Sequence, residues 1–229
     1  MKTVGLLDAL LGRSKPARPD LDQLFGLPAA AVTLQAGADL RPTGLGSVCF
    51  ASVEGGAFKQ VERDVRALLD ADPPPGDPGG PSGNPDDTPP GNPGIPGDAP
   101  PAVHGDVPVE FSQDEYGYTW LLTRHGPLGT ISLVNDLHAV NTLLAEGGFG
   151  PQLLCSVVGF RGAGDGDPRA LALVYLYKRG TFYPFAPRPG QPEKRDSALE
   201  LQVRGLLTDD LRMEPDLARW FPLWGAPGL

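Results

Sequence analysis

The sequence predicts an α+β fold in which helices pack on one face of a mainly antiparallel sheet. Three observations lead to this fold class. Apolar and aromatic runs of strand length occur in pairs separated by turn residues, as in β-hairpins. Segments with helical apolar periodicity follow them, which gives a coarse strand–strand–helix order along the chain. Hairpins with helices between them favour an antiparallel sheet over a parallel one.

The first 18 residues form a basic amphipathic arm, which we distinguish from a single α+β domain at 19–229. One interpretation is a helix that packs on its own core or on a partner subunit. The other is an interfacial helix on an anionic membrane, where each cation contributes about 1 kcal/mol. The apolar stripe consists of Val4, Leu6, Leu7, Leu10 and Leu11, and the cations are Lys2, Arg13, Lys15 and Arg18.

The first part of the domain is predicted to alternate between helices and strands. Asp20 is a candidate N-cap for a helix that ends at Leu27–Pro28. Residues 32–34 alternate as in a strand, and 47–52 predict a second short strand. From 56 to 71 the period is helical. The inward-facing residues of the two helices are predicted to be Leu21, Leu24, Phe25, Phe58, Val61, Val65, Leu68 and Leu69.

Residues 72–106 differ from the rest of the chain. They contain no lysine, arginine or aromatic residue, and proline, glycine and aspartate dominate. Such a segment buries too little apolar area to offset its ordering entropy, so we expect it to be disordered. Because closure entropy grows only logarithmically with length, we interpret it as an insertion within one domain.

Order is predicted to return at residue 107. Residues 107–111 and 116–124 predict a hairpin with its turn at Asp114–Glu115, and a helix follows that ends at Gly147–Gly148. Later in the chain, Ser197 to Glu200 has the form of a capping box opening a helix through Leu207, and Pro215 begins a last short helix. The large apolar side chains of the tail are expected on the core or at a subunit contact: Trp220, Phe221 and Trp224.

The most informative stretch is a hairpin within 151–185. Leu153 to Phe160 and Leu171 to Tyr177 predict strands, and glycine-rich turn residues at 162–168 join them. Odd and even positions are apolar in both strands. A strand that is apolar on both faces is covered on both faces, so this hairpin belongs in the centre of the sheet rather than at its edge.

Composition excludes several functional classes. The formal net charge is −9, so we expect no nucleic-acid binding, because a phosphate backbone must be met by lysine and arginine. No run of about 20 apolar residues is present to span a membrane, and the N-terminus lacks the pattern of an export signal. Cys49 and Cys155 lie in apolar runs and are interpreted as buried thiols of a cytoplasmic protein, a disulfide or reactive thiol being the alternative.

No catalytic or metal-binding pattern emerges from the ionisable residues. His104, His125 and His138 have no cysteine or carboxylate at metal-ligand spacing. The glycines at 162–166 precede a strand, whereas a phosphate-binding loop must precede a helix N-terminus. We therefore expect no enzyme activity, no metal and no cofactor.

The end of the second central strand carries the best candidates for recognition. Two adjacent cations lie there among tyrosines: Tyr175, Tyr177, Lys178, Arg179 and Tyr183. A guanidinium stacked on a tyrosine could hold an anion or a carboxylate of a partner. In the alternative interpretation, these cations pair with carboxylates of the chain itself.

Several long stretches resemble the PspAB family, the PspA-associated proteins. They are MKTVGLLDALLGRSKPARPDLDQLFGLP, DEYGYTW, DLHAVNTLL, GFGPQLLCSVVGF, LALVYLYKRGTFYPFAP, ALELQVR and RWFPLWGAPGL. The resemblance implies a link to the phage-shock, envelope-stress response through PspA, a coiled-coil protein that acts on the inner membrane surface. It implies no catalytic residues.

Three functional hypotheses follow. The first is a non-catalytic cytoplasmic partner of a PspA-type protein, docking through its arm and the Tyr175–Tyr183 surface, with peripheral contact to an anionic membrane as an option. The arm residues that carry it are Leu6, Leu7, Leu10, Leu11 and Arg13. The alternative is a small-molecule or anion-binding domain, or a weak hydrolase, centred on Lys178 and Arg179. The third is a subunit that only stabilises an assembly, and formation of a homo-oligomer is left open.

Overall fold

The computed structural model describes residues 19–51, 56–70 and 109–229. The predicted arm at 1–18 and the predicted insertion at 72–106 lie outside the described residues, and so does His104.

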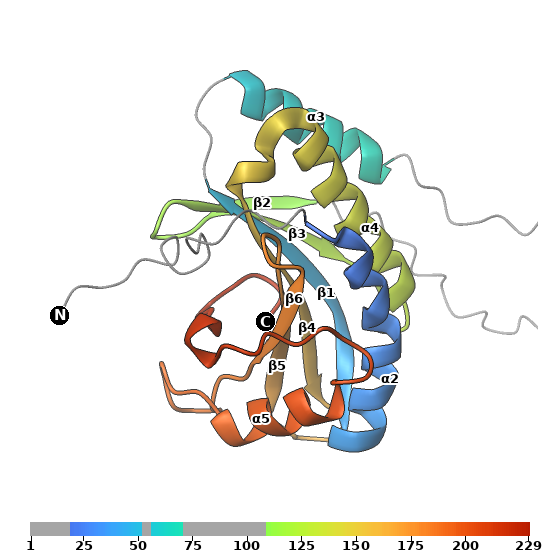
Figure 1. Cartoon of the computed structure of the whole chain (residues 1–229), viewed down its shortest axis with the longest axis vertical. Coiled ribbons are helices and arrows are strands. Elements are labelled where there is room, and N and C mark those ends of the chain that lie inside the picture. The colour runs from blue at the N-terminus through green and yellow to red at the C-terminus, as the bar shows by residue number, and fades with distance from the viewer. Residues whose placement is uncertain (1–18, 52–55, 71–108) are drawn as a thin grey trace, which may run out of the picture.

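A six-stranded sheet with antiparallel pairing throughout forms the centre of the molecule (Figure 1). The strand order is β2-β3-β1-β4-β5-β6, so the predicted α+β class is confirmed. The predicted central hairpin forms β4 and β5, and neither lies at an edge. The strands are β1 Leu40–Ala51, β2 Glu110–Gln113, β3 Tyr118–Arg124, β4 Leu153–Gly162, β5 Ala170–Leu176 and β6 Thr181–Phe185.

The two faces of the sheet are covered by different material. In β5, Leu171, Leu173 and Tyr175 face a large core shared with the helices, whereas Ala172 and Val174 face a second, smaller core. The second core is closed by residues of the C-terminal segment, Trp220, Leu223 and Ala226. The double apolar pattern of the central strands therefore arises from helices on one face and an irregular chain segment on the other.

The helices contribute apolar residues to the larger core. Leu68 of α3, which was predicted to face inward, is instead 36% exposed. α3 buries Val61 and Val65, and α4 ends at a turn where Gly148 has a φ of 88°, the left-handed conformation expected there. The helical elements are η1 Leu21–Gly26, α2 Leu27–Ala38, α3 Gly56–Asp70, α4 Thr130–Leu144, η2 Ala145–Phe149, η3 Gly150–Gln152, α5 Ser197–Leu206 and η4 Leu217–Arg219. Among the described helices, none is both long and apolar enough to cross a bilayer.

Residues 27–38 correct the sequence prediction. Leu27–Pro28 begins a helix instead of ending one, because proline in the first turn lacks only an N–H that would have no partner there. Residues 32–34, which were predicted to form a strand, lie in α2. Leu34 is buried there, and Val32 is 69% exposed. Phe25, predicted to face inward, is 50% exposed.

Strand β1 is twice as long as the predicted strand because a turn-like sequence lies within it. The pairing of β1 with β4 shifts register between Pro42 and Gly46. Gly44 has a φ of 80° there, and the chain just after β3 passes so close that a Cβ on Gly44 would meet the carbonyl oxygen of His125. Glycine thus permits an irregularity inside a strand rather than a break between elements.

Two further predictions were wrong in detail. The N-cap of α5 is Asp196, whose side chain accepts a hydrogen bond from the backbone N–H of Leu199, and not Ser197. Residues 181–185 form strand β6, which pairs with β5, although we read them only as a strand end. Among the described elements, one strand precedes α3 and three lie between α4 and α5, so the predicted strand–strand–helix order holds there only for β2, β3 and α4.

Candidate functional site

The three tyrosines of the predicted recognition surface are buried. Tyr175, Tyr177 and Tyr183 are between 1% and 3% exposed. The hydroxyl of Tyr175 donates to the carbonyl of Asp20, and that of Tyr183 donates to the carbonyl of Phe221. Burial raises the pKa of each of these hydroxyls. The expectation that these rings form a docking surface therefore does not agree with the structure.

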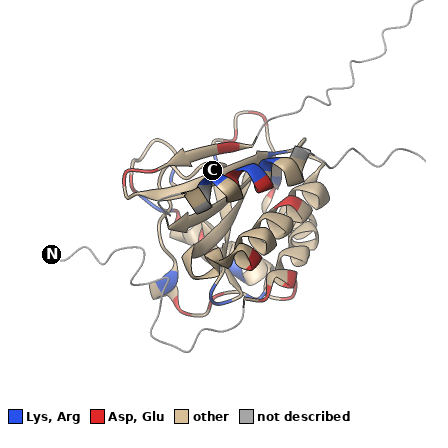
Figure 2. Cartoon of the chain, turned by 90° about the horizontal axis from the view of Figure 1, so that it is seen from above, with Lys and Arg blue, Asp and Glu red and all other residues tan. Residues whose placement is uncertain are grey.

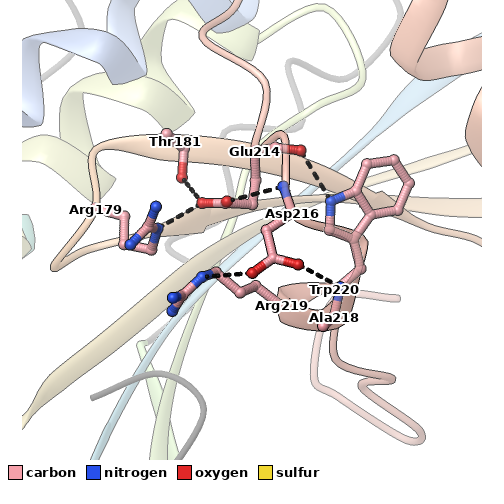
Figure 3. Close-up of polar contacts among 7 residues, drawn as sticks. All are labelled: Arg179, Thr181, Glu214, Asp216, Ala218, Arg219 and Trp220. Carbon is pink, nitrogen blue, oxygen red and sulfur yellow. Dashed lines mark hydrogen bonds and ion pairs between the residues drawn. The ribbon is translucent and has the colours of Figure 1, made fainter. Parts of the chain in front are cut away.

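Lys178 and Arg179 lie in the tight turn between β5 and β6. Lys178 Nζ donates to the carbonyl of Pro151 at 2.7 Å, and partial burial lowers the pKa of its ammonium. Arg179 Nε donates to Glu214 Oε2 at 2.6 Å (Figure 3). The pairing of the chain's own charges, which was the alternative interpretation, is therefore correct for Arg179.

Glu214 is the centre of a buried polar network. Its side chain has no exposed surface. Besides Arg179, Oε2 accepts the hydroxyl of Thr181 at 2.8 Å, and Oε1 accepts the backbone N–H of Asp216 at 3.2 Å (Figure 3). A buried carboxylate with three donors has its hydrogen-bonding capacity largely used, which is the arrangement expected of a structural ion pair.

This network fixes the C-terminal segment to the edge of the sheet. The backbone N–H of Glu214 donates to the carbonyl of Phe182 in β6, and the Glu214 carbonyl accepts the indole N–H of Trp220 at 3.1 Å. Asp216 then accepts from the backbone of Ala218 and pairs with Arg219, which closes η4. Residues 212–214 thus continue the hydrogen bonding of the sheet beyond β6 through an isolated bridge to Phe182.

A second buried ion pair holds the same segment from the other side. Glu200 of α5 accepts from Arg195 Nε and from the backbone N–H of Ala186, both at 2.9 Å. Arg195 also donates to the carbonyl of Trp220 and lies over the ring of Phe185. Sequence analysis assigned Glu200 to a capping box, because nothing local indicates a partner across the tertiary structure.

The two described histidines pair with carboxylates. His125 Nε2 lies 2.6 Å from Asp136 Oδ2, which also accepts the hydroxyl of Thr123. His138 Nε2 lies 3.6 Å from Asp22 Oδ1, and its ring lies 4.8 Å from that of Phe25. Within the described part of the chain, no group of three or more histidine, cysteine or acidic side chains is placed to hold a metal ion.

An open groove of about 520 Å³ runs between α3 and α4. α3 contributes residues spaced one and two turns apart, and α4 together with the start of η2 contributes a matching stripe next to the buried face of α4. The lining consists of Val61, Asp64, Leu68, His138, Ala139, Thr142, Leu143, Glu146 and Gly147. We call this feature the α3–α4 groove. Neither Lys178 nor Arg179 belongs to it.

The groove combines an apolar floor with an acidic rim. Leu68 is 36% exposed and Leu143 is partly buried, whereas the rim carboxylates Asp64 and Glu146 are exposed. Its nine lining residues include no lysine or arginine. Elsewhere along the described ribbon, basic and acidic residues are interspersed (Figure 2). The charge of a small surface such as the groove therefore depends on the few charged residues that line it.

Sequence analysis missed this groove because it took the apolar stripe of each helix, including Val61 and Leu68 of α3, to face the domain's own core. Ala139, Thr142 and Leu143 lie beside the buried stripe of α4 formed by Val134, Leu137 and Leu144. A widened apolar stripe on two helices is a signal that could have indicated a second contact face.

The family comparison covers both sides of the long insertion. A family model described as PspAB, PspA associated protein B, matches residues 4–78 and 101–228. The chain matches no curated protein and no solved structure.

Proposed function

Because this chain belongs to the PspAB family, we propose that it is a non-catalytic protein partner of a PspA-type coiled-coil protein in the envelope-stress response. The family description associates its members with PspA, and the role as a partner is our proposal. The contact is made through the N-terminal arm, residues 1–18.

The extent of the family match is the observation that carries this proposal. The match begins at residue 4, so the arm with its leucine stripe belongs to the family pattern together with the folded body. The arm carries four cations against the single carboxylate of Asp8 in a chain whose net charge is −9. An amphipathic helix of this kind is a recurring means of binding another helix or an anionic surface.

The environment of the buried charges favours a contact role over catalysis. Glu214 and Glu200 each have an arginine partner and a backbone N–H donor, and both brace the C-terminal segment. A general acid or base needs to reach a substrate, and these carboxylates are 0% and 3% exposed.

We place this function in the cytoplasm, at the inner face of the membrane. The two free thiols support a reducing compartment. Contact of the arm with anionic lipid is then a second, weaker interaction of the same basic residues, since one short helix gives only reversible attachment.

Capture of purified PspA by the full-length chain tests the proposal. Leu7→Asp with Leu11→Asp places charges on the leucine stripe, and we expect at least about 100-fold weaker binding, because two buried leucines contribute about 1.5–3 kcal/mol each. Leu128→Asp with Leu217→Asp is the matched control, since both leucines are at least half exposed in the body.

Unchanged affinity of the stripe variant would rule out the arm as the contact. Sedimentation with vesicles containing anionic lipid, in the absence of PspA, separates the membrane interaction from the protein interaction. A chain that binds only vesicles would contradict the partner role.

A further inference from the structure

The α3–α4 groove has the shape of a helix-binding site. Its walls are two helix faces, with residues 61, 64 and 68 on one side and 138, 142 and 146 on the other. The eight-residue step from 138 in α4 to 146 at the start of η2 corresponds to about 12 Å along the helix axis, or a little over two turns. An amphipathic helix that places leucines on the floor is the ligand that such a groove fits.

From this geometry we infer that the chain's own N-terminal arm docks in the α3–α4 groove. The arm and the groove are complementary in both apolar pattern and charge. Leu6, Leu7, Leu10 and Leu11 supply an apolar stripe for a floor that contains Val61, Leu68, Ala139 and Leu143. Arg13 and the other three cations of the arm match the rim carboxylates Asp64 and Glu146.

The start of the described chain lies beside the groove. The carbonyl of Asp20 is held by the hydroxyl of Tyr175, and Asp22 and Phe25 both contact His138, which lines the groove. In Figure 1, the dark-blue start of the coloured chain accordingly lies next to α4. The arm is therefore attached at the edge of the site that we assign to it.

The connecting residues are long enough for docking within one molecule. Six residues lie between Arg13 and Asp20, and the seven steps from one to the other, at about 3.3–3.6 Å each, span up to about 25 Å. A short tether of this kind gives an effective concentration in the millimolar range, so a weak contact is sufficient to hold the arm.

Docking in the groove would compete with binding to a partner, because one leucine stripe cannot fill both sites. This regulatory consequence rests on the proposed function, whereas the docking itself does not. The apparent affinity for PspA is then reduced by the fraction of molecules in which the arm is released.

A spin label on the arm tests docking in the full-length chain without any partner. Thr3→Cys places the label at the far end of the arm, and the native thiols, which are 0% and 2% exposed, are shielded from labelling. We expect strong paramagnetic broadening of the amide signals of Ala139, Thr142 and Leu143, and none at Gln202 on α5.

Charge variants of the rim identify the site. Asp64→Lys with Glu146→Lys, both at exposed positions, should abolish the broadening, and Arg13→Glu with Lys15→Glu in the same chain should restore it. Asp209→Lys, an exposed carboxylate next to α5, is the matched control and should leave the broadening unchanged.

Three results would overturn the inference. These are broadening that is absent from α3 and α4, broadening that persists in the rim variant, and broadening that disappears on dilution, which would assign the site to the arm of a second copy. The partner role is judged separately by PspA capture. If docking fails and capture succeeds, the docking and the competition are rejected and the partner role stands. If docking and capture both hold, the rim variants should bind PspA more tightly.

Discussion

Cys49 on β1 lies directly opposite Cys155 on β4, and both thiols are free and buried beneath the C-terminal segment. The hydrogen bond to Cys155, and then burial, raises the pKa of Cys49 well above its ordinary value of 9.0. Two thiols so close together are protected because they are shielded from solvent and rarely ionised. Their reactivity therefore measures whether the C-terminal segment stays in place.

We expect slow reaction of both thiols with an aromatic disulfide reagent in the native chain, even at pH 9. Ala226→Asp places a carboxylate in the second core, where Ala226 is 8% exposed, and should speed the reaction by about 10–100-fold. A buried polar group without a partner costs about 1–3 kcal/mol, and each 1.4 kcal/mol changes an opening equilibrium tenfold. Ala67→Asp, at an exposed position of α3, is the control. Equal rates in all three chains would contradict the assigned role of the segment.

Arg179→Met should destabilise the fold by about 3–5 kcal/mol, because it leaves the buried carboxylate of Glu214 without its cation. Arg124→Met should cost no more than about 1 kcal/mol, since its pair with Glu110 is exposed. Urea denaturation followed by circular dichroism gives both values. Similar costs for the two variants would mean that Glu214 does not depend on Arg179.

Trp220→Ala is expected to lower the free energy of unfolding by about 3–5 kcal/mol. The indole is 5% exposed, lies near the ring of Tyr183 and donates to the Glu214 carbonyl. Trp224→Ala should cost clearly less, because Trp224 is 37% exposed and contacts Phe185 mainly through its edge. Chemical denaturation compares the two, and a larger effect at Trp224 would be inconsistent with this packing.

Hydrogen bonds from Arg169 lower the pKa of Asp167 below its ordinary value of 3.8. A carboxylate whose pKa is lowered by folding stabilises the native state above its unfolded pKa, and this contribution is lost as the pH falls through the folded pKa. Asp167→Asn should therefore flatten the dependence of Tm on pH below about pH 4. Asp165→Asn, in the same turn but exposed, should keep the wild-type profile. Thermal unfolding from pH 2 to 6 checks this, and parallel profiles would exclude the contribution.

Much of the fold could be predicted because the local pattern and the tertiary environment agree. β5 is apolar at every position and β4 is apolar on both faces apart from Ser156 and its last two residues, and both strands lie inside the sheet. The glycine stop after α4 and the turn at Asp114 also follow from local backbone chemistry.

The errors arose where one local signal has two meanings. Pro28 is compatible with the end of one helix and with the first turn of another, and packing against α4 and β1 decides between them. Residues 181–185 were interpreted as the end of the preceding strand, whereas they form β6, an edge strand in which the missing N–H of Pro184 is tolerated.

The candidate site was less predictable than the fold. A cation next to tyrosines has the same sequence pattern whether the rings are exposed or buried. Tyr175 and Tyr183 became core residues because Asp20 and Phe221, distant in sequence, supply acceptors for their hydroxyls. The α3–α4 groove likewise depends on how two helices come together although 59 residues separate the end of α3 at Asp70 from the start of α4 at Thr130.

By itself, the sequence determined the fold class, the family, the central place of the doubly apolar hairpin and the contrast between a basic arm and an acidic body. Periodicity, turn chemistry and net charge are properties of neighbouring residues, so they can be read without coordinates. Only the tertiary structure decided that Arg179 serves Glu214, that a C-terminal segment covers the second face of the sheet, and that two helices leave an acidic-rimmed groove. Each of these depends on contacts between residues far apart in the chain, and such contacts are selected by the packing of the whole molecule.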